Sequence, residues 1–244
     1  FSIRLKPLPC FYPSSISKRN KGWHKREILQ SHQGWSTPKM FDQQDEIKNK
    51  KGPLSVLNLT GASKFFYQKS NFITAILATV IFIGYLLLVM MDKGAGFEVA
   101  DSNIRSLGTS FGFDQVDVIA FLSIRSDEMV TAYITFNQVW DVLFGVIYGV
   151  MYVVWVSVLF KPICDKVGRL NLVPVLQVIF DWLENYELVL LAHQYLSDGM
   201  ISASNVNLAS VFSMLKWACS GLTYTLISIG IILMIMRAVA NKNL

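Results

Sequence analysis

Apolar residues occur in uninterrupted runs that are long enough to cross a membrane. Residues 72–91 form a run of 20 residues without a charge, and a helix that rises 1.5 Å per residue needs about 20 apolar residues to span about 30 Å of hydrocarbon. A second run, residues 142–160, is equally free of charge. Both runs are predicted to be transmembrane helices, the first within a segment that covers residues 71–93.

Two further runs, residues 172–194 and 207–236, are interrupted by polar residues. The first contains three carboxylates, and the second contains Lys216 ahead of a clean portion, residues 218–236. Both must cross the membrane if the basic residues that flank the runs are to lie on one side. The chain is therefore predicted to be an all-α integral membrane protein with four transmembrane helices, of which residues 141–244 supply the last three.

The segment between the first two spans, residues 94–140, is acidic. From Asp127 onward its apolar residues follow a helical spacing, which predicts an amphipathic helix on the translocated side of the membrane. These apolar positions are Met129, Ala132, Tyr133, Phe136, Val139 and Trp140.

Charges are distributed unevenly along the chain. They make up 16% of its residues, below the roughly 25% of an average soluble domain. Residues 1–70 contain thirteen Lys or Arg and four acidic residues, a net +9, whereas the remaining residues contain nine basic and thirteen acidic residues, a net −4. Lys and Arg collect on the untranslocated side of a membrane protein. With four spans, all the basic flanking segments and both termini lie on that one side.

Residues 1–70 combine Pro, Ser, Lys, Gln and isolated aromatic residues without helical or strand periodicity. This composition predicts an extended basic N-terminal arm that is ordered only by contact with partner subunits or lipid headgroups. A basic, acid-poor start is typical of a processed organellar precursor. We therefore expect the mitochondrial inner membrane with both termini on the matrix side, or else another organellar membrane, and no nucleic-acid partner.

The third run carries the most informative polar residues. Asp181, Glu184 and Asn185 share one helix face, and a helix that enters the membrane near residue 172 places the two carboxylates roughly 13 Å and 18 Å deep. Charges at such depth normally face protein, water or each other. A proton or cation relay is one interpretation. We favour a buried polar network that fixes helix packing, because a relay needs such groups at several depths.

Two other runs offer partners for these carboxylates. Asp141 is expected at the translocated-side end of its helix, and Lys216 near the same level in the last helix. Glu187 is close enough to the end of its own helix to meet either residue. The sequence thus predicts an interhelical ion pair within Asp141, Glu187 and Lys216, in preference to a ligand site.

Small residues mark expected helix–helix contacts. Gly145 and Gly149 have the G-x-x-x-G spacing that lets two helix backbones approach closely. The last helix has a stripe of small and polar residues that includes Ser220 and Gly221. Both features are predicted to be packing surfaces.

No pattern in the chain points to a catalytic, cofactor or metal site. A di-iron helical bundle needs Glu-x-x-His pairs, yet the residue three before His193, the only histidine near the membrane, is Leu190. We expect no catalytic residue and no cofactor or metal, whereas a bound phospholipid such as cardiolipin is compatible with the sequence.

Four short motifs resemble those of a known group of proteins. They are Leu107-Gly108, the pair Asp141 and Tyr148, FD-x-x-EN from Phe180 to Asn185, and LKW from Leu215 to Trp217. Over about residues 107–237 the chain resembles an uncharacterised family of small multi-helix integral membrane proteins. The resemblance implies a shared membrane fold, without a reaction or functional residues to carry over.

These features together favour a structural role. The first expectation is an accessory subunit of a large mitochondrial inner-membrane energy-converting complex, such as a respiratory complex, a supercomplex or ATP synthase, that contributes to assembly and is not an enzyme. Its partners would be membrane lipids and other membrane subunits. The alternatives are a small proton or cation transporter or channel that uses the intramembrane carboxylates, an accessory subunit of a photosynthetic membrane complex, and an intramembrane enzyme that acts on lipid.

Overall fold

The structure is a computed structural model that describes residues 59–100 and 102–242, and these residues form helices joined by loops. The expectation of an all-helical chain is confirmed for this part. From Thr60 onward the described residues belong to one unit. The α-helices are α2 (Leu59–Lys69), α3 (Phe72–Tyr85), α4 (Met91–Gly94), α5 (Gln115–Ser123), α6 (Asp127–Thr135), α7 (Asp141–Phe160), α8 (Cys164–Val167), α9 (Val173–Asp198) and α10 (Ala203–Lys242).

Short π-helical and 3₁₀ turns join several of these helices into longer ones. The π turn Leu86–Met90 connects α3 to α4, and the π turn Phe136–Trp140 connects α6 to α7. Three helices are then long and apolar enough to cross a membrane: Phe72–Phe97, Asp127–Ile163 and Ala203–Asn241. The chain thus has the features of a membrane protein. The helix α9, expected as a further span, is not among the three because its central part carries three carboxylates.

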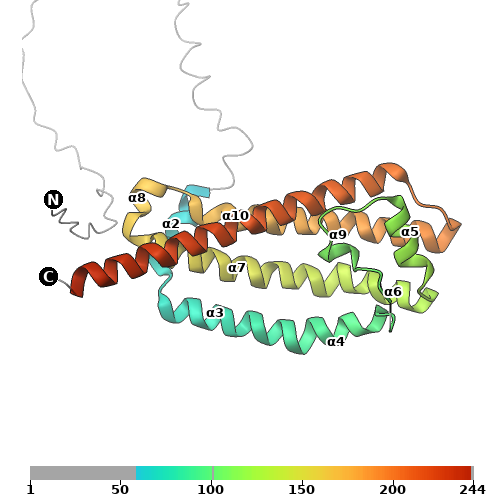
Figure 1. Cartoon of the computed structure of the whole chain (residues 1–244), viewed down its shortest axis with the longest axis horizontal. Helices are drawn as coiled ribbons and strands as arrows, with labels where there is room; N and C mark the ends of the chain where they lie inside the picture. Colours follow the sequence, from blue (N-terminus) through green and yellow to red (C-terminus); the bar gives the residue numbers. More distant parts are fainter. Residues whose placement is uncertain (1–58, 101, 243–244) are drawn as a thin grey trace, which may run out of the picture. The chain divides into compact units, whose positions relative to one another are not determined.

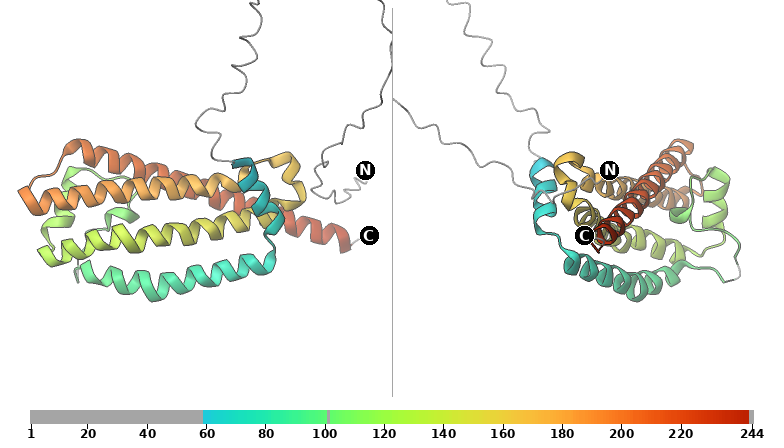
Figure 2. Two further views of the ribbon diagram at one scale, coloured as in Figure 1. Left: turned by 180° about the vertical axis from the view of Figure 1, so that it is seen from behind. Right: turned by 60° about the vertical axis from the view of Figure 1, so that its left-hand side comes forward.

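The long helices are arranged in the order α3, α7, α9 and α10 (Figure 1). α9 packs between α7 and α10, α10 also touches α7, and α3 packs mainly on α7. One end of this bundle, which we call the α6 end, holds α5 and α6. The other end, the α8 end, holds α2, α8 and the C-terminal part of α10, as both views in Figure 2 show. Apolar residues of α5, α6, α9 and α10 form the largest core cluster, at the α6 end.

Helix ends follow local sequence signals. Asn71 caps α3, since its side chain accepts a hydrogen bond from the Thr74 amide while the Thr74 hydroxyl accepts one from the Asn71 amide. Asp114 and Ser126 cap α5 and α6. α9 ends at Gly199, whose φ of 66° lies in the left-handed region that glycine adopts at low cost.

The predicted arm ends earlier than expected. Residues 1–58 of the predicted arm lie outside the described part of the chain, but Leu59–Lys69 is helical, so the expectation of an extended segment up to residue 70 is wrong for α2. Asn171, which is fully buried, donates hydrogen bonds to the Ser63 carbonyl and the Ser157 hydroxyl and accepts one from the Ser63 hydroxyl. Lys161 donates to the carbonyls at the end of α2. These bonds fasten α2 to α7 and to the turn before α9.

Replacing Asn171 with leucine tests this attachment. The variant leaves the buried Ser63 hydroxyl and carbonyl and the Ser157 hydroxyl without these partners, so we expect a loss of about 1–3 kcal/mol in the free energy of unfolding and faster proteolysis at α2. Thermal unfolding in detergent and limited proteolysis measure the two effects. Asn207→Leu, at an exposed position of α10, is the matched control. Equal stability of the two variants would contradict the attachment.

Candidate functional site

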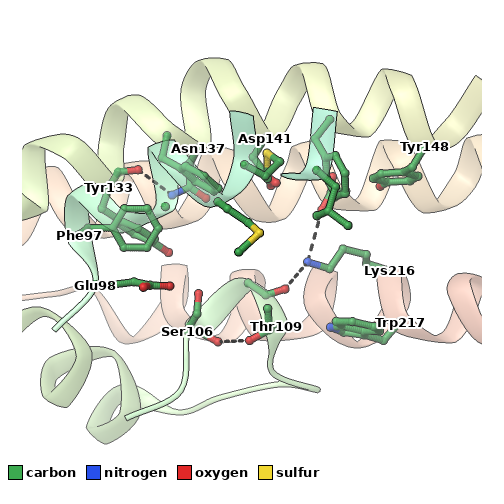
Figure 3. A pocket seen from close by; sticks show the side chains of 18 of the residues that line it. Phe97, Glu98, Ser106, Thr109, Tyr133, Asn137, Asp141, Tyr148, Lys216 and Trp217 are labelled. Atoms are coloured by element: carbon green, nitrogen blue, oxygen red, sulfur yellow. Dashed lines mark hydrogen bonds and ion pairs between the residues drawn. The ribbon is translucent and has the colours of Figure 1, made fainter. Parts of the chain in front are cut away.

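The central polar feature of the bundle is the Lys216 ammonium on α10. Its nitrogen forms an ion pair with Glu184, lies 3.4 Å from Asp181 Oδ1, and donates a hydrogen bond to the Gly108 carbonyl at 2.8 Å. Lys216 is 7% exposed and Glu184 is 0% exposed. Figure 3 shows the Lys216 side chain with dashed contacts on two sides, one of them to the loop. One cation therefore holds together α9, α10 and the loop that precedes α5.

A second polar contact ties α7 to the same network. The Asn185 side-chain amide donates to Asp141 Oδ2 at 2.7 Å. Asp141 opens α7, directly after the π turn Phe136–Trp140. Asp181, Glu184 and Asn185 were predicted to share one face of α9. This face meets both α7, through Asn185, and α10, through Asp181 and Glu184. We call Asp141, Asp181, Glu184, Asn185 and Lys216 the polar cluster.

The expected ion pair of Lys216 with Asp141 and Glu187 is not formed. The ion-pair partners of Lys216 are Asp181 and Glu184, and Glu187 forms no ion pair within the described part of the chain. α9 and α10 are antiparallel and joined by residues 199–202, so Lys216, thirteen residues into α10, lies level with Asn185. It is therefore within one turn of Asp181 and Glu184, whereas Glu187 is nearer the α6 end.

Two serines of α10 hold the same loop as Lys216. The Phe113 amide donates to the Ser210 hydroxyl at 3.0 Å, and the Ser213 hydroxyl donates to the Ser110 carbonyl at 2.7 Å. Gly112 has a φ of 76°, and a Cβ at this position would lie 3.2 Å from Ser210 Oγ. The spacing Ser-x-x-Ser-x-x-Lys on one helix face is the sequence signal for this contact. The backbone carbonyls that accept these hydrogen bonds have no sequence signal, because every residue type has a backbone carbonyl.

The close approach of α7 and α9 depends on the G-x-x-x-G pair. A Cβ on Gly149 would lie 2.5 Å from Val178 Cγ2, and a Cβ on Gly145 would lie 3.3 Å from Asp181 Oδ2. These glycines thus bring Asp181 against α7.

The last helix differs in part from expectation. Ser220 is buried, but Gly221 is exposed and a Cβ there would meet nothing within 4 Å, so its predicted packing role is wrong. Gly230 has that role instead, because its Cβ would lie 2.7 Å from Leu159 Cβ. The sequence does not show which of the two glycines of α10 packs against another helix. This depends on the rotation of α10 about its axis, which places Gly230 and not Gly221 against α7.

A cavity of about 710 Å³ lies beside the polar cluster. The segment from α3 to α4 forms one wall, α7 and α9 contribute Asp141 and Asp181, and α10 contributes Lys216 (Figure 3). Aromatic residues supply much of the lining: Phe82, Phe97, Tyr133, Phe136, Phe144, Tyr148, Tyr152, Trp217 and Tyr224. At the α6 end, Arg125 lines the cavity and donates to the Phe97 and Phe121 carbonyls. Burial lowers the pKa of its guanidinium below the usual value.

Both π turns line this cavity. Leu86 and Met90 come from one of them, and Phe136 and Asn137 from the other. The Tyr85 hydroxyl reaches across and donates to the Trp140 carbonyl at 2.9 Å. π turns inside α-helices are frequent at functional sites, so the cavity and the polar cluster together form the candidate site.

The chain matches no family model, no curated protein and no solved structure. Candidate function therefore rests on the geometry alone. Parts of all four motifs of the resemblance lie at the candidate site: Gly108, Asp141, Asp181 with Glu184 and Asn185, and Lys216. Within residues 59–100 and 102–242, no three His, Cys, Asp or Glu side chains are placed to hold a metal ion.

Proposed function

We propose that the chain is a four-span accessory subunit of a large energy-converting complex of the mitochondrial inner membrane, with a structural role in assembly and stability. The observation that carries this proposal is that every donor of the Lys216 ammonium has a partner in the protein. Its ammonium has three donors, and Glu184, Asp181 and Gly108 engage it from two structural elements. A cation held in this way stabilises one arrangement of helices, whereas a transport site must exchange its partners.

The burial of charge on α9 supports a fourth span. Asp181, Glu184 and Glu187 are 4%, 0% and 9% exposed, so the central part of the helix presents almost none of its charge to the outside. Its exposed positions are mainly apolar or aromatic, with Leu176, Ile179 and Tyr186 among them. A helix whose carboxylates are buried, two of them paired with Lys216, can cross hydrocarbon at much lower cost than its composition suggests.

The charges at the two ends of the bundle support the orientation with both termini on the matrix side. Basic residues lie in the elements of the α8 end: Lys64, Lys69, Lys161, Arg169 and Arg237. Acidic residues dominate the α6 end: Asp92, Glu98, Asp114, Asp117, Asp127, Glu128 and Asp198. The positive-inside rule then assigns the α8 end to the untranslocated side.

Helices α3 and α10 offer surfaces for other subunits. Ile73 and Leu88 of the α3 segment are each 77% exposed, and α10 exposes a row of apolar residues towards its C-terminal end, including Ile232 and Val239. In a membrane these faces meet lipid tails or neighbouring helices. An accessory subunit needs such faces.

Co-purification tests the proposal. A tagged chain, imported into mitochondria and solubilised in a mild detergent, is expected to migrate on a native gel with a complex several times its own mass and to bring respiratory or ATP-synthase subunits with it. Lys216→Met should lower the yield of that complex, whereas Lys93→Met, at a position that is 44% exposed, should not. Migration of the wild-type chain alone would contradict the proposal, and association with photosynthetic subunits would replace the mitochondrial host by a photosynthetic one.

The cavity favours a second candidate, a proton or cation transporter. The Asp181 carboxylate and the Tyr148 hydroxyl interact with each other beside the cavity, and the buried Gln177 Oε1 has no hydrogen-bond partner among the described residues. A liposome assay with a pH-sensitive dye discriminates the two candidates. The structural role predicts no flux above empty vesicles, whereas flux that Asp181→Asn abolishes would establish transport.

A further inference from the structure

The cavity borders the polar cluster and shares Asp181 with it, but its wall also carries polar atoms that the contacts of Lys216 do not use. Gln177, Asp181 and Tyr148 are each at least 94% buried and line its wall. Gln177 Oε1 has no hydrogen-bond partner within the described part of the chain, and the Tyr148 hydroxyl and the Asp181 carboxylate interact with each other but keep accepting lone pairs. Unpaired buried polar atoms are costly. A bound molecule that supplies hydrogen-bond donors would remove that cost.

The charge of the cavity selects the kind of donor. Glu98, Asp141 and Asp181 line it, against Lys216 and Arg125. Lys216 is engaged by two carboxylates and Arg125 by two backbone carbonyls. Glu98 and Asp141 form no ion pair within the described residues. The cavity groups that are left to bind a ligand are therefore carboxylates and other hydrogen-bond acceptors. They suit an ammonium group and repel a phosphate that has no attached cation.

The remaining lining of the cavity is aliphatic and aromatic, as suits the acyl chains of a lipid. Leu86, Phe82 and Met90 lie along the α3 wall, and Tyr152 and Tyr224 lie farther towards the α8 end. α3 packs mainly on α7 and α10 mainly on α9, so the cavity lies between two helices that the bundle leaves largely exposed. Its volume of about 710 Å³ is within the roughly 300–1,000 Å³ of ligand pockets.

We propose that this cavity binds one phospholipid with a primary-ammonium headgroup, such as phosphatidylethanolamine. The ammonium donates to Asp181 Oδ2, Gln177 Oε1 and Tyr148 Oη, and the Trp217 indole N–H, which also lines the cavity without a partner, donates to a phosphate or ester oxygen. The acyl chains lie against the aromatic and aliphatic wall. Cardiolipin, which the sequence allowed, has no ammonium group and does not suit this site. The proposal requires the chain to lie in a bilayer, but not to belong to a larger complex.

Native mass spectrometry of the detergent-solubilised full chain tests the proposal. The delipidated protein is mixed with ethanolamine, choline and glycerol phospholipids of identical acyl chains, and with cardiolipin. We expect one bound ethanolamine lipid per chain and a preference of about tenfold over the glycerol lipid, because only the ammonium supplies charged donors. The choline lipid, which has no N–H, should bind more weakly than the ethanolamine lipid. Equal or tighter binding of the glycerol lipid or cardiolipin would overturn the proposal.

Two variants locate the bound lipid without disturbing the polar cluster. Gln177→Leu removes an accepting oxygen that has no partner, and should reduce the preference for the ethanolamine lipid. Leu86→Trp fills the cavity and should abolish retention, whereas Leu88→Trp, on the same helix but 77% exposed and outside the cavity, should not. Equal effects of the two tryptophans would overturn the site. Soluble phosphoethanolamine should not displace the lipid, and displacement would mean that the ligand is a soluble amine.

Discussion

Lys216→Met is expected to lower the free energy of unfolding by about 3–5 kcal/mol, the cost of removing one partner from a buried ion pair. The variant leaves Asp181 and the fully buried Glu184 without their cation, and it leaves the Gly108 carbonyl without its donor. Methionine keeps the length and the apolar stem of the side chain. Lost charge compensation is therefore the main effect of the substitution.

Reversible unfolding in mixed detergent micelles measures this effect. Lys93→Met is the matched control, because Lys93 makes its ion pair with Asp92 at an exposed site, where such pairs contribute about 0–1 kcal/mol. A loss for Lys216→Met no larger than that of the control would contradict the role of the network.

A combined variant separates the charge from the packing. Lys216→Met together with Asp181→Asn and Glu184→Gln removes all three charges, and should recover a substantial part of the stability that Lys216→Met loses. Replacing a whole buried ion network by neutral groups is often close to neutral, whereas breaking it is not. If the triple variant is as unstable as the sum of its single changes, the cluster acts through shape and not through charge.

The sequence was sufficient for the long helices and for the identity of the polar residues, but not for the short helix α2. Apolar runs of 19 or 20 residues have few alternatives to a long helix, and α7 begins and ends close to the expected residues. Asp181, Glu184 and Asn185 were expected on one face because helical spacing alone determines this. Their partners on other helices depend on how far those helices are shifted and rotated relative to α9. The spacing of residues within one helix carries no information about this.

The depth of the polar cluster shows this limit. The expected depth assumed that α9 begins at the membrane surface. The buried hydrogen bonds of Asn171 to Ser157 and Ser63 place the start of α9 inside the bundle. Asp141, which receives the Asn185 bond, is nineteen residues before Phe160, or about 28 Å along α7. The cluster therefore lies far from the α8 end of α7, and its depth in a membrane stays a prediction.

Glycines in the helices illustrate the same point at the level of packing. Gly149 and Gly221 are both helical glycines with small or polar neighbours in the sequence, yet only Gly149 is in contact with another helix. A Cβ on Gly149 would meet Val178, a β-branched residue that has little freedom to move away in a helix. The two positions therefore form a matched pair for one substitution.

Gly149→Leu is expected to destabilise the bundle by about 3 kcal/mol, the upper end of the usual range for an overpacked core. The new side chain would have to displace Val178 and force α7 and α9 apart, which would also disturb the contact of Asp181 with Gly145. Gly221→Leu, at an exposed position with nothing within 4 Å, should be neutral or stabilising by up to about 1 kcal/mol, because leucine has the higher helix propensity. Unfolding in mixed micelles compares the two.

A double-mutant cycle identifies the contact that is responsible. Gly149→Ala adds only the Cβ that would lie 2.5 Å from Val178 Cγ2, and Val178→Ala removes that methyl group. If the two side chains collide, the double variant is more stable than the sum of the single effects predicts, by about 0.5–3 kcal/mol, as for residues in direct contact. Additive effects would mean that the helices adjust elsewhere. The close approach of α7 and α9 would then not be the feature that holds Asp181 against α7.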